Sequence, residues 1–144
     1  LCAQQWKLQY NATVKFPNDP RNTMLYANTT RGCAMVVGHI EDAIKVSEHK
    51  EKLPLAVIMR EGESPWPLPW YFAGLENAGY WNDGKFPDNY GEFEILVVDS
   101  GAELPENFDE SKYDCASAGL RRNLNLFVYI EKELFKKICT EKEK

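Results

Sequence analysis

The chain has 144 residues, enough for one domain that buries roughly 68–70% of its unfolded surface. Its net charge of −5 argues against a general nucleic-acid binder, because contacts to phosphates need clustered lysine and arginine. No run of about eighteen apolar residues occurs, so we expect no membrane-spanning helix within these residues. The start at Leu1-Cys2-Ala3, without a signal-peptide pattern, suggests a piece of a longer protein.

The first half of the chain predicts a strand, a helix and a second strand in succession. Residues 5–15 alternate in part, which fits a strand or the tail of a helix, and Met24–Ala27 is a short apolar strand candidate. Thr29 or Thr30 then caps a helix. The apolar stripe of this helix has a period of about 3.6 and comprises Cys33, Val36, Val37, Ile40 and Ile44. Leu55–Met59 is continuously apolar, as in a strand buried on both faces, so we expect a parallel βαβ unit.

The second half of the chain predicts mainly strands. Ala78–Trp81 is a short strand or a sheet edge, and Glu94–Asp99 is a central strand. Residues 124–130 alternate with a period of two, and Glu131–Ile138 is a closing helix. The predicted fold class is therefore α/β, a single domain over residues 1–144 with a mixed, mainly parallel sheet and flanking helices.

Metal and redox sites are not expected from the cysteines and histidines. The cysteines lack the close spacing of zinc and redox motifs, and a single disulfide among them stays open. They are Cys2, Cys33, Cys115 and Cys139. His39 and His49 have no acidic partners at ligand spacing. We therefore expect no metal and no cofactor.

Residues 63–72, which we name the aromatic loop, are the most unusual stretch of the chain. They contain three prolines, two tryptophans, a tyrosine and a phenylalanine. Proline fixes φ and lacks a backbone donor, so we expect a loop of polyproline character that becomes a short helix at Pro69. The rings either cap the end of the sheet or form a recognition surface. Because ligands of open α/β sheets usually bind at the carboxyl ends of strands, we favour recognition.

The candidate binding residues lie on the aromatic loop and on polar segments near it. Aromatic faces with hydrogen-bonding neighbours suit sugars or extended peptides. The set comprises Trp66, Pro67, Pro69, Trp70, Tyr71, Tyr80, Trp81, Glu61, Asp83, Arg21 and Asn22. No nucleophile–histidine arrangement and no glycine-rich phosphate loop is indicated, so no catalytic residue is assigned. Carboxylate pairs such as Glu61 with Glu63, or Asp83 with Asp88, leave a glycoside-cleaving enzyme as an alternative.

Several strings occur in an order that resembles a known family. They are Asp19-Pro20-Arg21-Asn22, Tyr26-Ala27-Asn28-Thr29, Trp66-Pro67-Leu68-Pro69-Trp70-Tyr71-Phe72, Gly79-Tyr80-Trp81, Leu120-Arg121, and Leu126-Phe127-Val128-Tyr129-Ile130-Glu131-Lys132-Glu133-Leu134-Phe135. Together they resemble the C-terminal soluble part of the flippase activity-associated proteins of bacteria and archaea. These multi-pass membrane proteins are related to protein mannosyltransferase-like (family 39, GT-C) glycosyltransferases. The likeness covers residues 5–138.

The resemblance implies an accessory, non-catalytic domain that faces away from the cytoplasm and follows a transmembrane region before Leu1. In this class of enzyme the transferring carboxylate typically lies in the membrane part, so the chain alone is not expected to be an enzyme. Thr23-Met24, Asn28 and Ala73 stand where the family tends to have Pro-Tyr, His and a nearby Arg, which implies binding rather than catalysis. The implied partners are the membrane part of the parent protein and a lipid-linked sugar or glycan.

Two other functions stay open at this point. One is a free-standing carbohydrate-active enzyme that uses a carboxylate pair. The other is a pure interaction domain that assembles a membrane complex.

Overall fold

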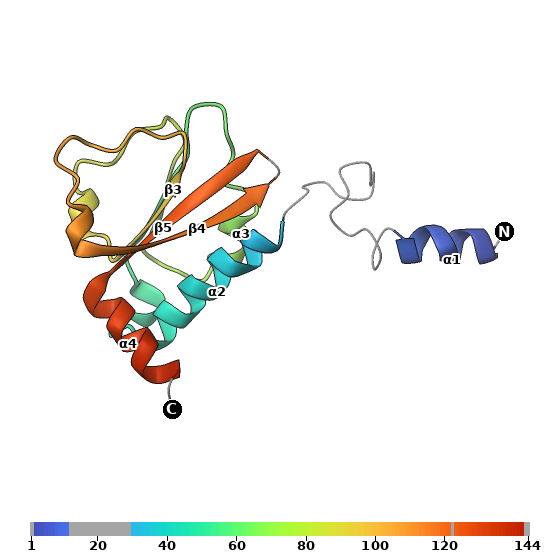
Figure 1. The fold of residues 1–144 in the computed structure, drawn as a ribbon, viewed down its shortest axis with the longest axis horizontal. Coiled ribbons are helices and arrows are strands. Elements are labelled where there is room, and N and C mark those ends of the chain that lie inside the picture. Colours follow the sequence, from blue (N-terminus) through green and yellow to red (C-terminus); the bar gives the residue numbers. More distant parts are fainter. Residues whose placement is uncertain (1, 12–29, 122, 143–144) are drawn as a thin grey trace.

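A computed structural model describes residues 2–11, 30–121 and 123–142, and Figure 1 draws its ribbon. The first element is helix α1 (Cys2–Tyr10), so residues 5–10 of the partly alternating segment are helical, and residues 12–15 lie outside the described residues. The strand predicted at Met24–Ala27 lies outside the described residues. None of the described helices is long and apolar enough to cross a membrane.

A five-stranded sheet in the order β2-β1-β3-β5-β4 forms the centre of the fold. Its strands are β1 (Leu55–Ile58), β2 (Ala78–Trp81), β3 (Ile95–Asp99), β4 (Tyr113–Arg121) and β5 (Leu124–Glu131). Strand β1 pairs in parallel with β2 and β3, whereas β5 runs antiparallel to β3 and β4. The predicted α/β class is confirmed, with a mixed sheet that is parallel at its β2 end. Strand β2 lies at an edge and β3 at the centre, as predicted.

Helix α2 (Arg31–Val46) begins where the sequence predicts because Thr30 caps it. The Oγ1 of Thr30 accepts a hydrogen bond from the N–H of Gly32 at 3.1 Å. The same hydroxyl donates to the carbonyl oxygen of Gly119 in β4, which ties the start of the helix to the sheet. Cys33, Val36, Val37 and Ile40 of the predicted stripe are buried. The fifth predicted residue, Ile44, is only partly buried, and its neighbour Ala43 is buried instead.

Helix α4 (Lys132–Lys142) continues past Ile138, where the sequence predicts its end. Leu134 and Ile138 are buried and belong to the core that the helix shares with α2. Near its end, the Nζ of Lys142 lies 2.7 Å from the Oδ2 of Asp42 on α2. This contact gives the polar end of α4 a partner that the helical period does not reveal.

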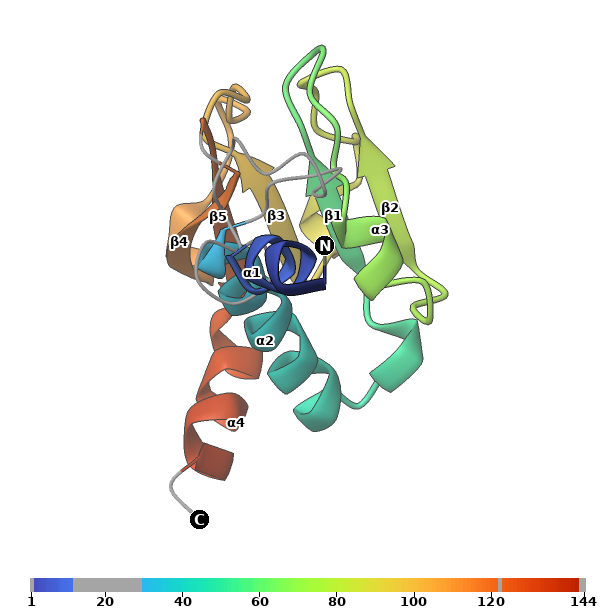
Figure 2. The ribbon, with the colours of Figure 1, turned by 90° about the vertical axis from the view of Figure 1, so that its right-hand side faces the viewer.

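The two faces of the sheet are covered by different layers (Figures 1 and 2). Helices α2 and α4, with the single turn of α3 (Leu68–Tyr71), cover one face. Loops cover the other face, where their rings Phe86, Phe93 and Phe108 pack with rings of the strands: Trp81, Tyr113, Phe127 and Tyr129. A short 3₁₀ turn at Lys50–Lys52 lies between α2 and β1, and two more lie between strands at Tyr90–Glu92 and Glu110–Lys112. Strands β1 and β3 are therefore buried on both faces.

Candidate functional site

The aromatic loop leaves the carboxyl end of β1 through a tight turn. The N–H of Glu63 donates to the carbonyl oxygen of Arg60 at 3.2 Å. Between them Gly62 has a φ of 82°, which L side chains rarely adopt. The N–H of Trp66 then donates to the Oγ of Ser64 at 3.2 Å. The first half of the loop thus lies where β1 ends, as predicted.

Three buried residues fix the second half of the aromatic loop. Pro65, Leu68 and Phe72 are buried, and the last two belong to the core cluster of the helical face. The N–H of Leu68 donates to the carbonyl oxygen of Pro65 at 2.9 Å, and the N–H of Phe72 donates to that of Leu68 at 3.0 Å. Pro69 lies in the first turn of α3, as predicted. The loop therefore starts at the strand ends and turns back over the helical face (Figure 2).

The large rings of the loop are exposed. The exposed fractions are 41% for Trp66, 71% for Trp70 and 53% for Tyr71. Leu68 and Phe72 pack the loop against the core, so the three exposed rings do not cap the sheet. The prolines between them, Pro67 and Pro69, are half-buried. An exposed ring on an anchored backbone loses little conformational entropy when it contacts a partner.

Tyr80 and Trp81 have packing partners of their own. Both are half-buried residues of the edge strand β2. Tyr80 packs against the helical core, and burial raises the pKa of its phenol. Trp81 packs in the opposite layer, where its ring centroid lies 5.7 Å from that of Phe93. Because consecutive strand residues face opposite sides, these two rings do not form one surface.

Glu61 and Asp83 lie on neighbouring loops, and both are exposed. The N–H of Gly84 donates to the backbone carbonyl that follows β1 at 2.8 Å, which holds the two loops side by side. The Oδ1 of Asp83 accepts a hydrogen bond from the backbone N–H two residues further on, at 3.2 Å. This carboxylate therefore shapes its own turn. The remaining candidates, Arg21 and Asn22, lie outside the described residues.

A charged cluster at the ends of β1, β3 and β4 was not predicted as a unit. We name Arg60, Glu63, Asp99 and Arg121 the arginine cluster. The Nε of Arg60 lies 3.4 Å from the Oδ2 of Asp99, whose side chain is fully buried. Arg121 donates to the carbonyl oxygen of Ser64. A signal for part of this cluster exists in the sequence, because the carboxyl ends of parallel strands such as β1 and β3 meet at one edge.

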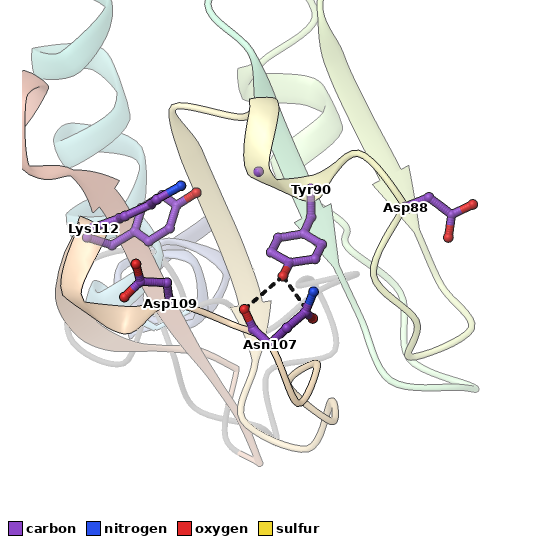
Figure 3. A pocket seen from close by; sticks show the side chains of 7 residues that line it. Asp88, Tyr90, Asn107, Asp109 and Lys112 are labelled. Atoms are coloured by element: carbon purple, nitrogen blue, oxygen red, sulfur yellow. Dashed lines mark hydrogen bonds between the residues drawn. The ribbon is translucent and has the colours of Figure 1, made fainter.

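A polar hollow of about 240 Å³ lies over the aromatic layer (Figure 3). Its lining consists of Asp88, Tyr90, Gly91, Asn107, Asp109, Lys112 and Tyr113. The Oη of Tyr90 donates to the Oδ1 of Asn107 at 3.1 Å. Hydrogen bonds from Ser111 hold the pKa of Asp109 below its usual value. In Figure 3 the carboxylates of Asp88 and Asp109 lie on opposite sides of Tyr90 and point away from one another, unlike the flanking pair of a glycosidase.

The described histidines, cysteines and carboxylates do not gather into a metal site. Among the described residues, no group of three or more His, Cys, Asp or Glu side chains is placed to hold a metal ion. The His49 Nε2 lies 3.1 Å from the Oε1 of Glu94, at the amino end of β3. Burial raises the pKa of the Cys33 thiol, and the side chain of Cys2 lies outside the described part. The free cysteines of the described chain are Cys33, Cys115 and Cys139.

The described residues therefore bring an exposed aromatic segment and a charged cluster together near the end of β1. No family model, curated protein or solved structure matches this chain.

Proposed function

We propose that the chain is a non-catalytic recognition domain that binds its ligand through the aromatic loop. The observation that carries the proposal is the exposure of Trp66, Trp70 and Tyr71 on a segment that Leu68 and Phe72 anchor in the core. Tryptophan and tyrosine are enriched at contact surfaces because they combine a large apolar face with a polar group. With polar neighbours, such faces suit a sugar ring or an extended peptide.

The ordered strings suggest a setting for this recognition. In our proposal the chain is the accessory extracytoplasmic domain of a membrane glycosyltransferase-like protein. It follows a transmembrane region and holds a lipid-linked sugar, an acceptor or a partner near the membrane part, which carries out the transfer. The reading frame upstream of Leu1 tests this setting, since several hydrophobic segments there support it and their absence contradicts it.

Alanine substitution of Trp70 and of Tyr71 tests the recognition role. We expect both variants of the full-length protein to lose function while the domain stays folded. In the isolated chain, both should weaken the binding of oligosaccharides or peptides, followed through the indole N–H signals in NMR spectra. Met35→Ala is the matched control, because Met35 is an exposed apolar residue on α2 outside the loop. Retained function and binding in both loop variants contradict the proposal.

A second candidate is a free-standing carbohydrate-active enzyme, which the side-by-side loops of Glu61 and Asp83 favour. This candidate requires the isolated chain to hydrolyse a glycoside and Glu61→Gln to abolish the hydrolysis. An inactive chain, or full activity in Glu61→Gln, excludes it. A pure interaction domain is the third candidate. Capture of the detached membrane part without any binding of glycans distinguishes it from the first.

A further inference from the structure

Arg60 and Arg121 share one carboxylate in the arginine cluster. The Oε1 of Glu63 lies 3.3 Å from the Nη2 of Arg60, and its Oε2 lies 3.6 Å from the Nη2 of Arg121. Both distances exceed the roughly 2.7–2.9 Å of a strong charge-assisted hydrogen bond. Among the described residues, the Nε of Arg121 is buried without a hydrogen-bond partner. The two guanidinium groups therefore have donor capacity that Glu63 does not use.

The two carboxylates of the cluster differ in how firmly they are held. Asp99 is fully buried, and its Oδ1 accepts a hydrogen bond from the N–H of Gly101 at 2.9 Å. The buried Asp99 carboxylate therefore fixes the position of the Arg60 guanidinium through their ion pair. The side chain of Glu63 is 34% exposed and lies in a surface loop, where a change of rotamer turns its carboxylate toward solvent. Without Glu63, the cluster retains two cations and one anion, which favours an external carboxylate in its position.

The aromatic loop contains both Glu63 of this cluster and Trp66. Arg121 donates to the carbonyl oxygen of Ser64, and the Oγ of Ser64 accepts the N–H of Trp66 at 3.2 Å. The indole is 41% exposed, and the side chains of Arg60 and Arg121 are 39% and 27% exposed. Trp66 is joined to Arg121 through Ser64, and an indole together with guanidinium groups offers the contacts that a sugar ring carrying a carboxylate needs.

We propose that Arg60 and Arg121 bind the carboxylate of an acidic saccharide, a uronic acid, and that Glu63 competes for the same position. The inference rests on the proposed function, because it names the substrate class of the same recognition surface. The ligand carboxylate bridges the two guanidinium groups, while Trp66 packs against the sugar ring. Glu63 thereby lowers the affinity for the ligand, and neutral sugars bind without this contribution.

An NMR titration of the chain with glucuronate, glucose and acetate tests the proposal. We expect glucuronate to bind more tightly than the other two and to shift the side-chain N–H signals of both arginines. Glu63→Gln keeps the shape of the competitor and removes its charge, so it should tighten glucuronate binding about tenfold. Arg121→Gln should weaken binding about tenfold or more, and Arg121→Lys should rescue it only in part. The matched control is Glu41→Gln, which removes the same charge from an exposed residue on α2, outside the aromatic loop.

Three outcomes overturn the inference. Unchanged or weaker glucuronate binding in Glu63→Gln means that the cluster only ties the loop to the sheet. Equal affinities for glucuronate and glucose remove the role of the carboxylate, and tighter binding of inorganic phosphate than of glucuronate assigns the arginines to another anion. If Arg121→Gln does not fold, the Glu63→Gln and Glu41→Gln pair still decides, because neither substitution removes a backbone contact.

The alanine variant of Trp70 separates this inference from the proposed function. Glucuronate binding that depends on Arg121 but survives both Trp70→Ala and Tyr71→Ala supports the carboxylate site and contradicts the wider role of the aromatic loop. Glucuronate binding that is lost in Trp70→Ala but unaffected by Arg121→Gln supports the loop and overturns the carboxylate site.

Discussion

Leu68 and Trp70 lie two residues apart on α3, yet their substitution by alanine should have opposite consequences. Leu68 is fully buried, so Leu68→Ala leaves a cavity in the helical core and should cost about 2–5 kcal/mol of the free energy of unfolding. Trp70 is 71% exposed, so of roughly 200 Å² of ring surface only about 60 Å² is buried. At about 25 cal/mol per Å², Trp70→Ala therefore costs at most about 1.5 kcal/mol.

Urea unfolding followed by far-ultraviolet circular dichroism measures both values, with Tyr71→Ala as a second exposed-ring variant. We expect a clearly lower midpoint for Leu68→Ala and nearly wild-type midpoints for the two ring variants, with similar slopes in all of them. In ligand binding the order should reverse, because in our proposal the rings and not Leu68 contact the ligand. A Trp70→Ala variant as unstable as Leu68→Ala would refute the reasoning, since the ring would then belong to the core.

Two further predictions concern the scaffold. Gly32→Ala should destabilise the chain by about 1–3 kcal/mol in thermal or urea unfolding, because its new methyl group overlaps the carbonyl oxygen of Gly119. Gly38→Ala on the same helix should stabilise the chain by about 0.5–1 kcal/mol, since nothing lies within 4 Å of the added carbon. Equal effects of Gly32→Ala and Gly38→Ala would contradict the tight contact between α2 and β4. Burial raises the pKa of Tyr129 to about 12. The contribution of this phenol to the free energy of unfolding is therefore complete below its unfolded-state pKa of about 10 and is lost as the pH rises toward 12. Tyr129→Phe should flatten this alkaline decline in unfolding experiments between about pH 10 and 12, and an unchanged decline would refute the assignment.

The main elements of the fold follow from local patterns in the sequence. The continuous apolar run of β1, the alternation of β5 and the capped stripe of α2 each lie within one segment, so they are visible without knowledge of the rest of the chain. The length of α4 was underestimated because its last turn is supported by Asp42 on α2, a contact between distant segments. Local periodicity carries no information about such a contact.

The candidate site was predictable only in its composition. The sequence identifies the rings of the aromatic loop, but it cannot tell that Leu68 and Phe72 are buried while their neighbours are exposed. That difference depends on how one turn of helix lies on the core. The arginine cluster is still harder to predict from the sequence, since the contact between Ser64 and Arg121 joins residues 57 positions apart. Such pairs arise from the order of the strands in the sheet and not from spacing along the chain.

The two attachments of the aromatic loop predict that its affinity and its shape can be changed separately. Its second half is held by Leu68 and Phe72, and its first half by the bond from Arg121 to the backbone carbonyl of Ser64. Neither attachment uses the Glu63 side chain, so Glu63→Gln should leave the tryptophans as exposed as before. Quenching of tryptophan fluorescence by acrylamide should therefore be the same in Glu63→Gln and in the unsubstituted chain, even where their affinities for glucuronate differ. A marked loss of quenching in Glu63→Gln would instead mean that this carboxylate positions the rings, and that an affinity change reflects loop geometry and not competition.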